Sequence, residues 1–197
     1  VGRNYADHAL ELGHPLPPEP LLFLKPPSTL LPADGAIALP PQSQQVEYEG
    51  ELAVVIGAIC RGGTLAEART AIWGYTIAND VTARDLQRQD EQWTRAKGFD
   101  TFCPLGPWIV REISPTARLQ TFLNGGAVQS ATIDTALFAP EILVAFISQV
   151  MTLQPGDVIL TGTPAGTGPL QPGDRVRVEI EGIGQLLNRV VLAAARC

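Results

Sequence analysis

Three glutamates alternate with other residues just before a buried apolar run. Glu47, Glu49 and Glu51 belong to the stretch VEYEGELAVVIG, residues 46–57. Successive side chains of a strand point to opposite faces, so the three carboxylates would share one face. Carboxylates held that close repel one another unless water or a cation lies between them. For an isolated Glu-x-Glu, an exposed strand end with solvated charges is the simpler interpretation.

A fourth carboxylate changes that interpretation. Gly74–Asn79 is also apolar enough for a buried strand, and Asp80 follows it directly. Two apolar strands whose ends both carry acids suggest convergence on a hard divalent cation, for which oxygen ligands are expected. Mg²⁺ commonly keeps waters and takes carboxylates together with substrate oxygens. The pattern therefore predicts a cation site open to a chelating substrate.

Positive charge is concentrated after Asp80. Arg84, Gln87 and Arg88 fall on one face of an expected helix by the i, i+3, i+4 rule, and Lys97 follows. The formal net charge is −6, so an acidic chain that acts on an acidic substrate must gather its cations locally. Arg84 and Gln87 could reach a carboxylate bound near the metal. Arg88 is interpreted as part of a solvated face.

A histidine–glutamate pair lies near the start of the sequence. His8 and Glu11 are i, i+3 neighbours on an expected helix, so Glu11 can orient the imidazole and stabilise its protonated form. Such a pair can act as a general base on water. A lone histidine beside a glutamate is more often a surface contact, so this pair alone does not establish catalysis.

A glycine- and threonine-rich loop follows an expected strand near the C-terminal end. The stretch reads GDVILTGTPAGTG, residues 156–168. It has no Gly-Lys-Ser/Thr ending, and Pro164 removes a backbone donor, so phosphate binding is poorly supported. Backbone N–H groups and hydroxyls that bind substrate oxygens fit the stretch better.

Composition excludes several classes of protein. The pI near 4.9 and the lack of a basic run argue against nucleic-acid binding. The apolar runs are too short to span a bilayer, and no signal peptide is evident. Three scattered cysteines, Cys60, Cys103 and Cys197, predict a reducing compartment, and we expect a cytoplasmic protein. The chain begins without Met, which suggests that a short natural N-terminus is missing.

The elements that must position these residues are mostly strands. Nineteen glycines and seventeen prolines punctuate short apolar runs, which is typical of a β-rich α+β fold, and we expect one domain over residues 1–197. Trp73 and Trp108 are expected in the core. Expected strands are Leu21–Leu24, Ala36–Leu39, Glu51–Ile56, Trp73–Asn79, Trp108–Val110, Ala117–Leu123, Asp157–Thr161 and Arg175–Ile180. Expected helices are Asn4–Leu12, Leu65–Ala71 with a Thr64 capping box, Val81–Glu91 with Thr82 as N-cap, and Ala139–Thr152.

Six stretches in series resemble the fumarylacetoacetate hydrolase family and cover nearly the whole chain. They are GRNYADHALELG, PLLFLKPPSTLL, EYEGELAVVIG, GYTIANDVTARDLQ, QWTRAKGFDTFCPLGPWI and GDVILTGTPAGTG. The resemblance implies a rolled mixed β-sheet around the active site, a few helices, and a homodimer.

The resemblance also implies roles for individual residues. It implies Mg²⁺ or Mn²⁺ held by the second and third glutamates and by the aspartate, with Glu47 excluded. It further implies a water-activating pair, a lysine that stabilises developing negative charge, and residues that approach the substrate. In this sequence the metal ligands are Glu49, Glu51 and Asp80, the catalytic residues are His8, Glu11 and Lys97, and the substrate-binding residues are Arg84, Gln87 and Thr163.

These roles predict a metal-dependent hydrolase that cleaves C–C bonds in 2,4-diketo acids of the acylpyruvate or fumarylpyruvate type. The same site could decarboxylate oxaloacetate. An alternative is an enzyme of the 2-hydroxyhepta-2,4-diene-1,7-dioate isomerase or 5-oxopent-3-ene-1,2,5-tricarboxylate decarboxylase type, which needs the metal but no activated water. A non-catalytic protein that binds oxo acids is the third possibility.

Overall fold

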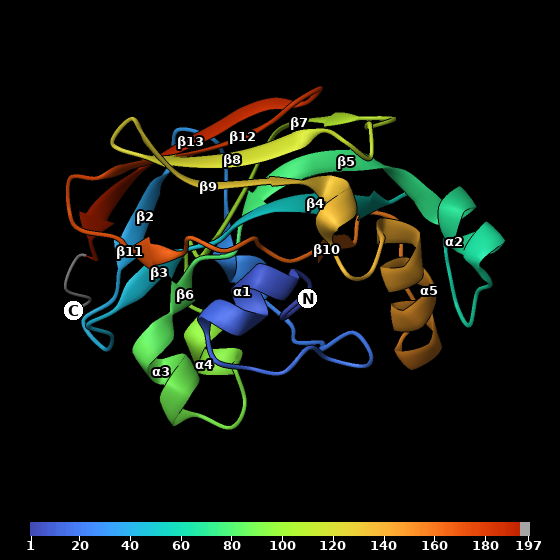
Figure 1. Cartoon of the computed structure of the whole chain (residues 1–197), viewed down its shortest axis with the longest axis horizontal. Coiled ribbons are helices and arrows are strands. Elements are labelled where there is room, and N and C mark those ends of the chain that lie inside the picture. The colour runs from blue at the N-terminus through green and yellow to red at the C-terminus, as the bar shows by residue number, and fades with distance from the viewer. Residues whose placement is uncertain (194–197) are drawn as a thin grey trace.

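The computed structural model describes residues 1–193 and shows a β-dominated α+β fold with a curled mixed sheet and a few short helices (Figure 1). This confirms the predicted fold class. The helices are α1 Ala6–Glu11, α2 Leu65–Ala71, α3 Arg84–Gln89, α4 Thr94–Lys97 and α5 Pro140–Val150, with 3₁₀ turns at Pro27–Thr29 and Ile133–Thr135.

The strands form three sheets. The first has the order β1-β7-β5-β4-β10, the second β11-β3-β6, and the third β2-β13-β12-β8-β9. Their bounds are β1 Leu30–Leu31, β2 Ala36–Leu39, β3 Val46–Tyr48, β4 Gly50–Ile56, β5 Ile72–Asn79, β6 Thr82–Ala83, β7 Cys103–Val110, β8 Arg118–Leu123, β9 Gly126–Thr132, β10 Val158–Leu160, β11 Gly168–Pro169, β12 Arg175–Ile180 and β13 Gly184–Leu192.

Strand β4 is buried along its whole length, which explains its continuous apolar sequence. Val54 and Ile56 pack in a core cluster with residues of α2 and α5, the two helices beside the right-hand end of β4 in Figure 1. Leu52 packs in a second cluster with β8 and β12 of the third sheet, which lies above β4 and β5 in the same view. The strand therefore enters the core immediately after its acidic start.

Antiparallel pairing of β4 with β5 brings the predicted acids together. Gly50 pairs with Asn79, so the start of β4 lies beside the end of β5. The backbone N–H of Asp80 donates to the carbonyl of Glu49 at 2.8 Å, and the Asn79 side chain accepts from the backbone N–H of Glu49 at 2.9 Å. Residues thirty positions apart thus become direct neighbours.

Several predicted elements are confirmed by the structure. Thr64 and Glu67 form the capping box of α2. The strand expected over Ala117–Leu123 is present as β8, and its hairpin with β9 turns at Asn124-Gly125, both with positive φ, as a type I′ turn requires. Helix α5 begins at Pro140. The fixed φ of proline suits the first helical position, and its missing N–H costs nothing there because that group would have no partner within the helix.

Other predictions were wrong. Leu21–Leu24 is not a strand, since only Leu21 makes an isolated bridge, to Gly2. The helix expected from Val81 begins at Arg84, because Thr82 and Ala83 pair with β3 and stay extended. Trp73 and Trp108 are 47% and 59% exposed, so neither side chain belongs to the core.

No helix within residues 1–193 is long and apolar enough to cross a membrane. Cys60 and Cys103 are buried and unpaired, as expected for small apolar side chains, while Cys197 lies outside the described residues.

Candidate active site and metal centre

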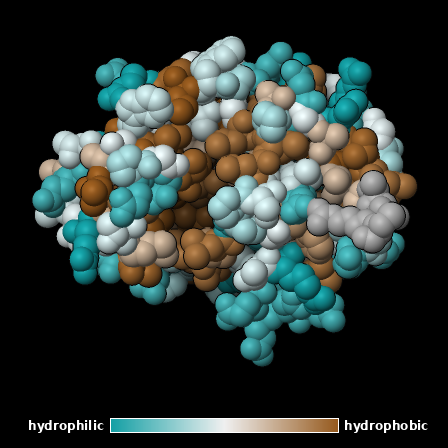
Figure 2. Space-filling model, turned by 180° about the vertical axis from the view of Figure 1, so that it is seen from behind, coloured by the Kyte–Doolittle hydropathy of each residue, from teal (hydrophilic) through white to brown (hydrophobic). Residues whose placement is uncertain are grey.

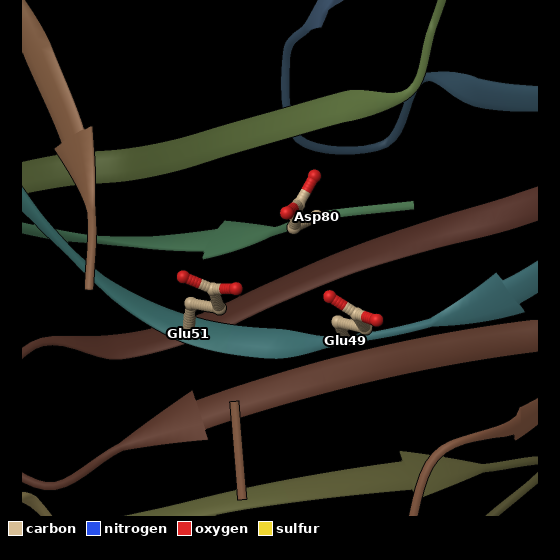
Figure 3. A group of neighbouring side chains, drawn as sticks. All are labelled: Glu49, Glu51 and Asp80. Carbon is tan, nitrogen blue, oxygen red and sulfur yellow. The ribbon is translucent and has the colours of Figure 1, made fainter. Parts of the chain in front are cut away.

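Three buried carboxylates converge at the junction of β4 and β5. Glu49, Glu51 and Asp80 each offer an oxygen, and these oxygens lie within 4.8 Å of one another. Figure 3 shows Glu51 on β4 and Glu49 just before it rising from the same side of the chain, with Asp80 beside them after the end of β5. The side-by-side placement expected from strand alternation and from the two acidic strand ends is therefore present.

Two lysines hold the aspartate and one glutamate. The Lys97 ammonium donates to Glu49 Oε2 at 2.8 Å and to Asp80 Oδ2 at 2.7 Å. The Lys25 ammonium donates to Asp80 Oδ1 and to the Lys97 carbonyl, both at 2.7 Å. Burial alone would raise the pKa of Asp80, but the two lysines hold that pKa below its usual value.

Arg84 joins Glu47 to Glu49. Its Nε donates to Glu47 Oε2 at 2.8 Å, and one terminal nitrogen donates to Glu49 Oε1 at 2.6 Å. The other donates to Gln87 Oε1 at 2.5 Å, so every face of the guanidinium is engaged. Burial opposes ionisation of Glu49, yet Lys97 and Arg84 keep its pKa low.

Glu51 is the one carboxylate of this group without a cationic partner among residues 1–193. Lys25, Arg84 and Lys97 pair with Glu47, Glu49 and Asp80, so three positive charges face three negative ones. Burial raises the pKa of Glu51 to about 8, against the opposing charge of the nearby Val1 ammonium and with the charges of Asp80 and Glu49 adding to the shift. A protonated Glu51 completes a neutral cluster, and a divalent cation would displace that proton.

Gly50, between Glu49 and Glu51, admits no side chain. A Cβ at this position would lie 2.2 Å from Thr121 Oγ1 and 3.0 Å from a methyl carbon of Val178. Its N–H donates to the buried Gln129 Oε1 at 3.0 Å, and its carbonyl accepts from Thr163 Oγ1 at 2.9 Å. Close approach of β8 and β12 thus requires glycine in the Glu-Gly-Glu motif.

The glycine- and threonine-rich loop binds the protein's own carboxylates. The N–H of Gly162 donates to Glu51 Oε2 at 2.5 Å, and the N–H of Gly166 donates to both oxygens of Glu11 at 3.1 and 3.2 Å. Both glycines have positive φ, where a side chain would be strained. Thr163 Oγ1 also accepts from Gln129 at 2.8 Å, so its hydroxyl is fully engaged. Contact of Thr163 with a substrate carboxylate stays a prediction.

Helix α1 carries the histidine pair over this loop. His8 is buried, and its Nδ1 lies 3.3 Å from Glu11 Oε2, while Glu11 is partly exposed. Asn4 anchors the segment, because its amide donates to the carbonyls of Phe138 and Thr161 and accepts from the Phe138 N–H. Helix and loop are therefore held in a fixed relation.

One pocket of about 470 Å³ joins these parts. It contains every predicted site residue except Asp80, which lies behind Lys97 with no exposed surface. Trp93 and His14 also border it. The pocket is lined by Val1, Gly2, Arg3, His8, Glu11, Leu12, His14, Phe23, Glu49, Glu51, Arg84, Gln87, Arg88, Trp93, Lys97 and Thr163.

Sequence reasoning missed three residues of the site. Lys25 pairs with an acid 55 positions away, and Gln129 comes from β9, so no local spacing announces either one. Arg3 lies in the pocket beside the predicted pair on α1. The available signal was the single lysine of PLLFLKPPSTLL and the arginine of GRNYADH, both in stretches that carried the family resemblance.

The three carboxylates fit a hard divalent cation. They supply oxygen donors only, from two rigid strands, and Glu51 has a raised pKa of the kind that metal binding relieves. Each oxygen that accepts from a lysine or an arginine keeps a second lone pair. Glu49, Glu51 and Asp80 would therefore hold Mg²⁺ or Mn²⁺ with positions left for substrate.

Comparison with known proteins agrees with this site. Residues 1–191 match the family model described as fumarylacetoacetate (FAA) hydrolase C-terminal. The human mitochondrial oxaloacetate tautomerase FAHD2A is 44% identical over 204 aligned positions, which span 97% of this chain and 65% of that protein.

Two solved structures superpose closely. A 2-hydroxyhepta-2,4-diene-1,7-dioate isomerase from Mycobacterium marinum has a TM-score of 0.91 and 48% identity, covering 99% of this chain and 74% of that one. A fumarylpyruvate hydrolase from Pseudomonas aeruginosa in complex with Mn²⁺ and pyruvate has a TM-score of 0.92 and 34% identity, covering 98% and 88%. The chain belongs to the fumarylacetoacetate hydrolase family.

Proposed function

We propose that this chain is a divalent-metal-dependent hydrolase that cleaves a C–C bond in 2,4-diketo acids of the acylpyruvate or fumarylpyruvate type. The observation that carries the proposal is that Glu49 and Glu51 line the same pocket as the His8–Glu11 pair. The similar fumarylpyruvate hydrolase from Pseudomonas aeruginosa, in complex with Mn²⁺ and pyruvate, supports both the metal and the substrate class.

Charge supports an anionic substrate. With Glu51 deprotonated and a divalent cation bound, the buried cluster carries one net positive charge. That charge suits the carboxylate of a 2-oxo acid, which would lie beside the cation with its 2-oxo group. A bound Mg²⁺ or Mn²⁺ would supply Lewis-acid polarisation of these oxygens.

Individual residues of the chain then carry out separate steps of the reaction. His8 takes a proton from water, whose oxygen attacks the C4 carbonyl, and Glu11 holds the imidazole in position. The C3–C4 bond breaks, its electron pair stays on the pyruvate fragment, and C3 takes up a proton. Lys97 lies beside that developing charge and stabilises it, while Arg84, Gln87 and Thr163 border the substrate.

Acylpyruvate cleavage tests this proposal. We expect turnover of an acylpyruvate with Mg²⁺ or Mn²⁺, and its loss with EDTA or in Glu49→Ala. His8→Ala should lower kcat by about 10²–10⁴-fold, the usual contribution of a general base. Activity indifferent to EDTA, Glu49→Ala and His8→Ala would refute the proposal.

A second candidate is an isomerase, tautomerase or decarboxylase of 2-oxo acids. Its support is that FAHD2A and the Mycobacterium marinum isomerase share 44% and 48% identity with the chain, against 34% for the hydrolase. These reactions need the cation but no attacking water. A panel of oxaloacetate, acylpyruvates, fumarylpyruvate and the heptadienedioate, with product identification, separates the candidates. Isomerisation or decarboxylation that survives in His8→Ala would favour the second.

We also propose that the chain forms a homodimer in the cytoplasm. Figure 2 shows hydrophobic residues gathered across the middle of one face. Large apolar side chains stay exposed among residues 1–193, including those of Leu24, Leu30, Trp108 and Val150. Sedimentation equilibrium should give twice the 21.0 kDa of the chain. A monomer mass at micromolar concentration would refute the dimer.

A further inference from the structure

One guanidinium in the pocket has no hydrogen-bonding partner. Arg3 lines the pocket, and its Nε is buried without an acceptor. Within residues 1–193 its other nitrogens also make no hydrogen bond or ion pair. A buried donor without a partner is uncommon in native proteins and calls for a missing acceptor.

The other cations of this pocket are already committed. Lys97 bridges Glu49 and Asp80. Arg84 is buried against Glu47, Glu49 and Gln87. Arg88 is exposed at the pocket and donates to the side chain of Gln45 at 3.1 Å.

Arg3 is joined to the catalytic centre by an aromatic wall. Its guanidinium carbon lies 6.0 Å from the ring centroid of Trp93. Trp93 packs edge-on against Phe23, with ring centroids 5.4 Å apart, and the Lys97 ammonium lies 4.9 Å from the Phe23 ring. An extended substrate that starts at the carboxylate cluster can follow this wall, and Arg3 then lies at its far end.

The backbone holds Arg3 in a costly conformation. Its φ is +57°, which only a small minority of residues other than glycine adopt. The flanking residues fix it there. The Gly2 N–H donates to the Leu21 carbonyl at 2.9 Å, and the side-chain amide of Asn4 donates to the Phe138 carbonyl and accepts from the Phe138 N–H. A Cβ on Gly2 would lie 2.8 Å from the Trp93 ring, so this close approach is also specific. Strain that the surroundings enforce concentrates at functional sites.

We propose that Arg3 binds a second carboxylate at the far end of the substrate, so that the enzyme prefers dicarboxylic 2-oxo acids over monocarboxylic ones. This inference rests on the proposed function, since it names the substrate class of the same pocket. A guanidinium binds a carboxylate through two parallel N–H donors, and such charge-assisted pairs are strong in a partly buried site.

Two matched pairs of compounds test Arg3. The cleavable pair is 2,4-dioxoheptanedioate and 2,4-dioxoheptanoate, which differ only in a terminal carboxylate or methyl. The second pair lacks the 4-oxo group and cannot be hydrolysed: 2-oxoheptanedioate and 2-oxoheptanoate, with the C5 and C6 homologues to vary reach. We would measure kcat/KM for the first pair and calorimetric Kd with Mn²⁺ for the second.

We expect wild type to prefer the dicarboxylate in both assays. Arg3→Gln should lower that preference by about 10- to 100-fold, as for loss of a charge-assisted hydrogen bond. Arg3→Lys should recover part of it. The matched control is Arg88→Gln, which removes a positive charge from the same pocket and should change the preference less than about twofold. Circular dichroism melts would verify that each variant is folded.

The two assays separate this inference from the proposed hydrolysis. Cleavage of diketo acids without an Arg3-dependent preference at any chain length would overturn the role of Arg3. The same holds if Arg88→Gln matches Arg3→Gln. An Arg3-dependent preference in calorimetry, with neither diketo acid cleaved, would support the role of Arg3 and refute the hydrolase.

Discussion

The carboxylate centre and the pocket mouth differ in how their charges are satisfied. At the centre, Arg84 and Lys97 are buried and Lys25 is mostly buried, and each donates to carboxylates at 2.6 to 2.8 Å. At the mouth, Arg3 lies against an aromatic ring and has no acceptor within the described residues 1–193, and Glu11 is partly exposed.

This difference indicates two separate roles, one for the centre and one for the pocket mouth. A buried, paired cluster fixes the geometry of ligands before a cation arrives, because moving any charge would leave another uncompensated. At the mouth, Arg3 is only partly buried, and its guanidinium, whose Nε has no acceptor among residues 1–193, stays available to a ligand. The centre is therefore suited to holding a cation, and the mouth is suited to selecting among the proposed substrates.

The largest expected effect is the difference in the free energy of unfolding between a Lys25 variant and an Arg3 variant. Lys25→Met leaves Asp80 with one compensating charge fewer in the interior, so the free energy of unfolding should fall by about 3 kcal/mol. Arg3→Gln should change it by less than about 0.5 kcal/mol. Urea unfolding of both variants measures the difference. Equal losses would show that centre and mouth are not distinct.

The next prediction distinguishes Glu49 from Glu47 by the effect of each on Mn²⁺ affinity. Glu49→Gln should weaken Mn²⁺ binding by at least ~100-fold, because it removes a ligand charge. Glu47→Gln is the matched control, since Glu47 also pairs with Arg84 but lies outside the ligand set, and it should cost about tenfold. Calorimetric titration with Mn²⁺ measures both. A larger loss of Mn²⁺ affinity in Glu47→Gln than in Glu49→Gln would mean that Glu47, and not Glu49, is the metal ligand.

Packing at the centre makes a third prediction. Gly50→Ala should destabilise the fold by about 2 kcal/mol through its clash with Thr121 Oγ1. Thr121→Ala in the same chain should recover much of that loss, since this hydroxyl has no hydrogen-bond partner to lose. Gly126→Ala is the control, because its nearest neighbour would lie 3.6 Å away. Thermal melts that show no rescue by Thr121→Ala would contradict the clash.

The smallest effect concerns pH. Burial raises the pKa of Glu51 to about 8, so the metal-free fold favours its neutral form at pH 7. Mn²⁺ requires the ionised form, so its affinity should rise about tenfold from pH 6 to 7. Titrations in buffers of different ionisation enthalpy should show close to one proton released at pH 7. A flat profile would mean that Glu51 is ionised without metal.

Local sequence patterns predicted much of the fold. The unbroken apolar run of β4 and the Thr64 capping box depend on residues close in sequence, so spacing alone reveals them. Leu21–Leu24 failed because its composition suits a strand, yet no neighbour provides backbone pairing beyond Leu21. The start of α3 failed because pairing of Thr82 and Ala83 with β3 overrode their helical context.

The same division applies to the site. By itself, the sequence determined which residue types are present, that Glu49 and Glu51 share one strand face, and that His8 and Glu11 are helical neighbours, because these relations depend only on local geometry. Only the tertiary structure decided that Lys25 pairs with Asp80, that Arg84 and Lys97 are committed to carboxylates, and that Arg3 is not. The antiparallel register and burial join residues far apart in sequence, and charges removed from water must find partners wherever the fold places them.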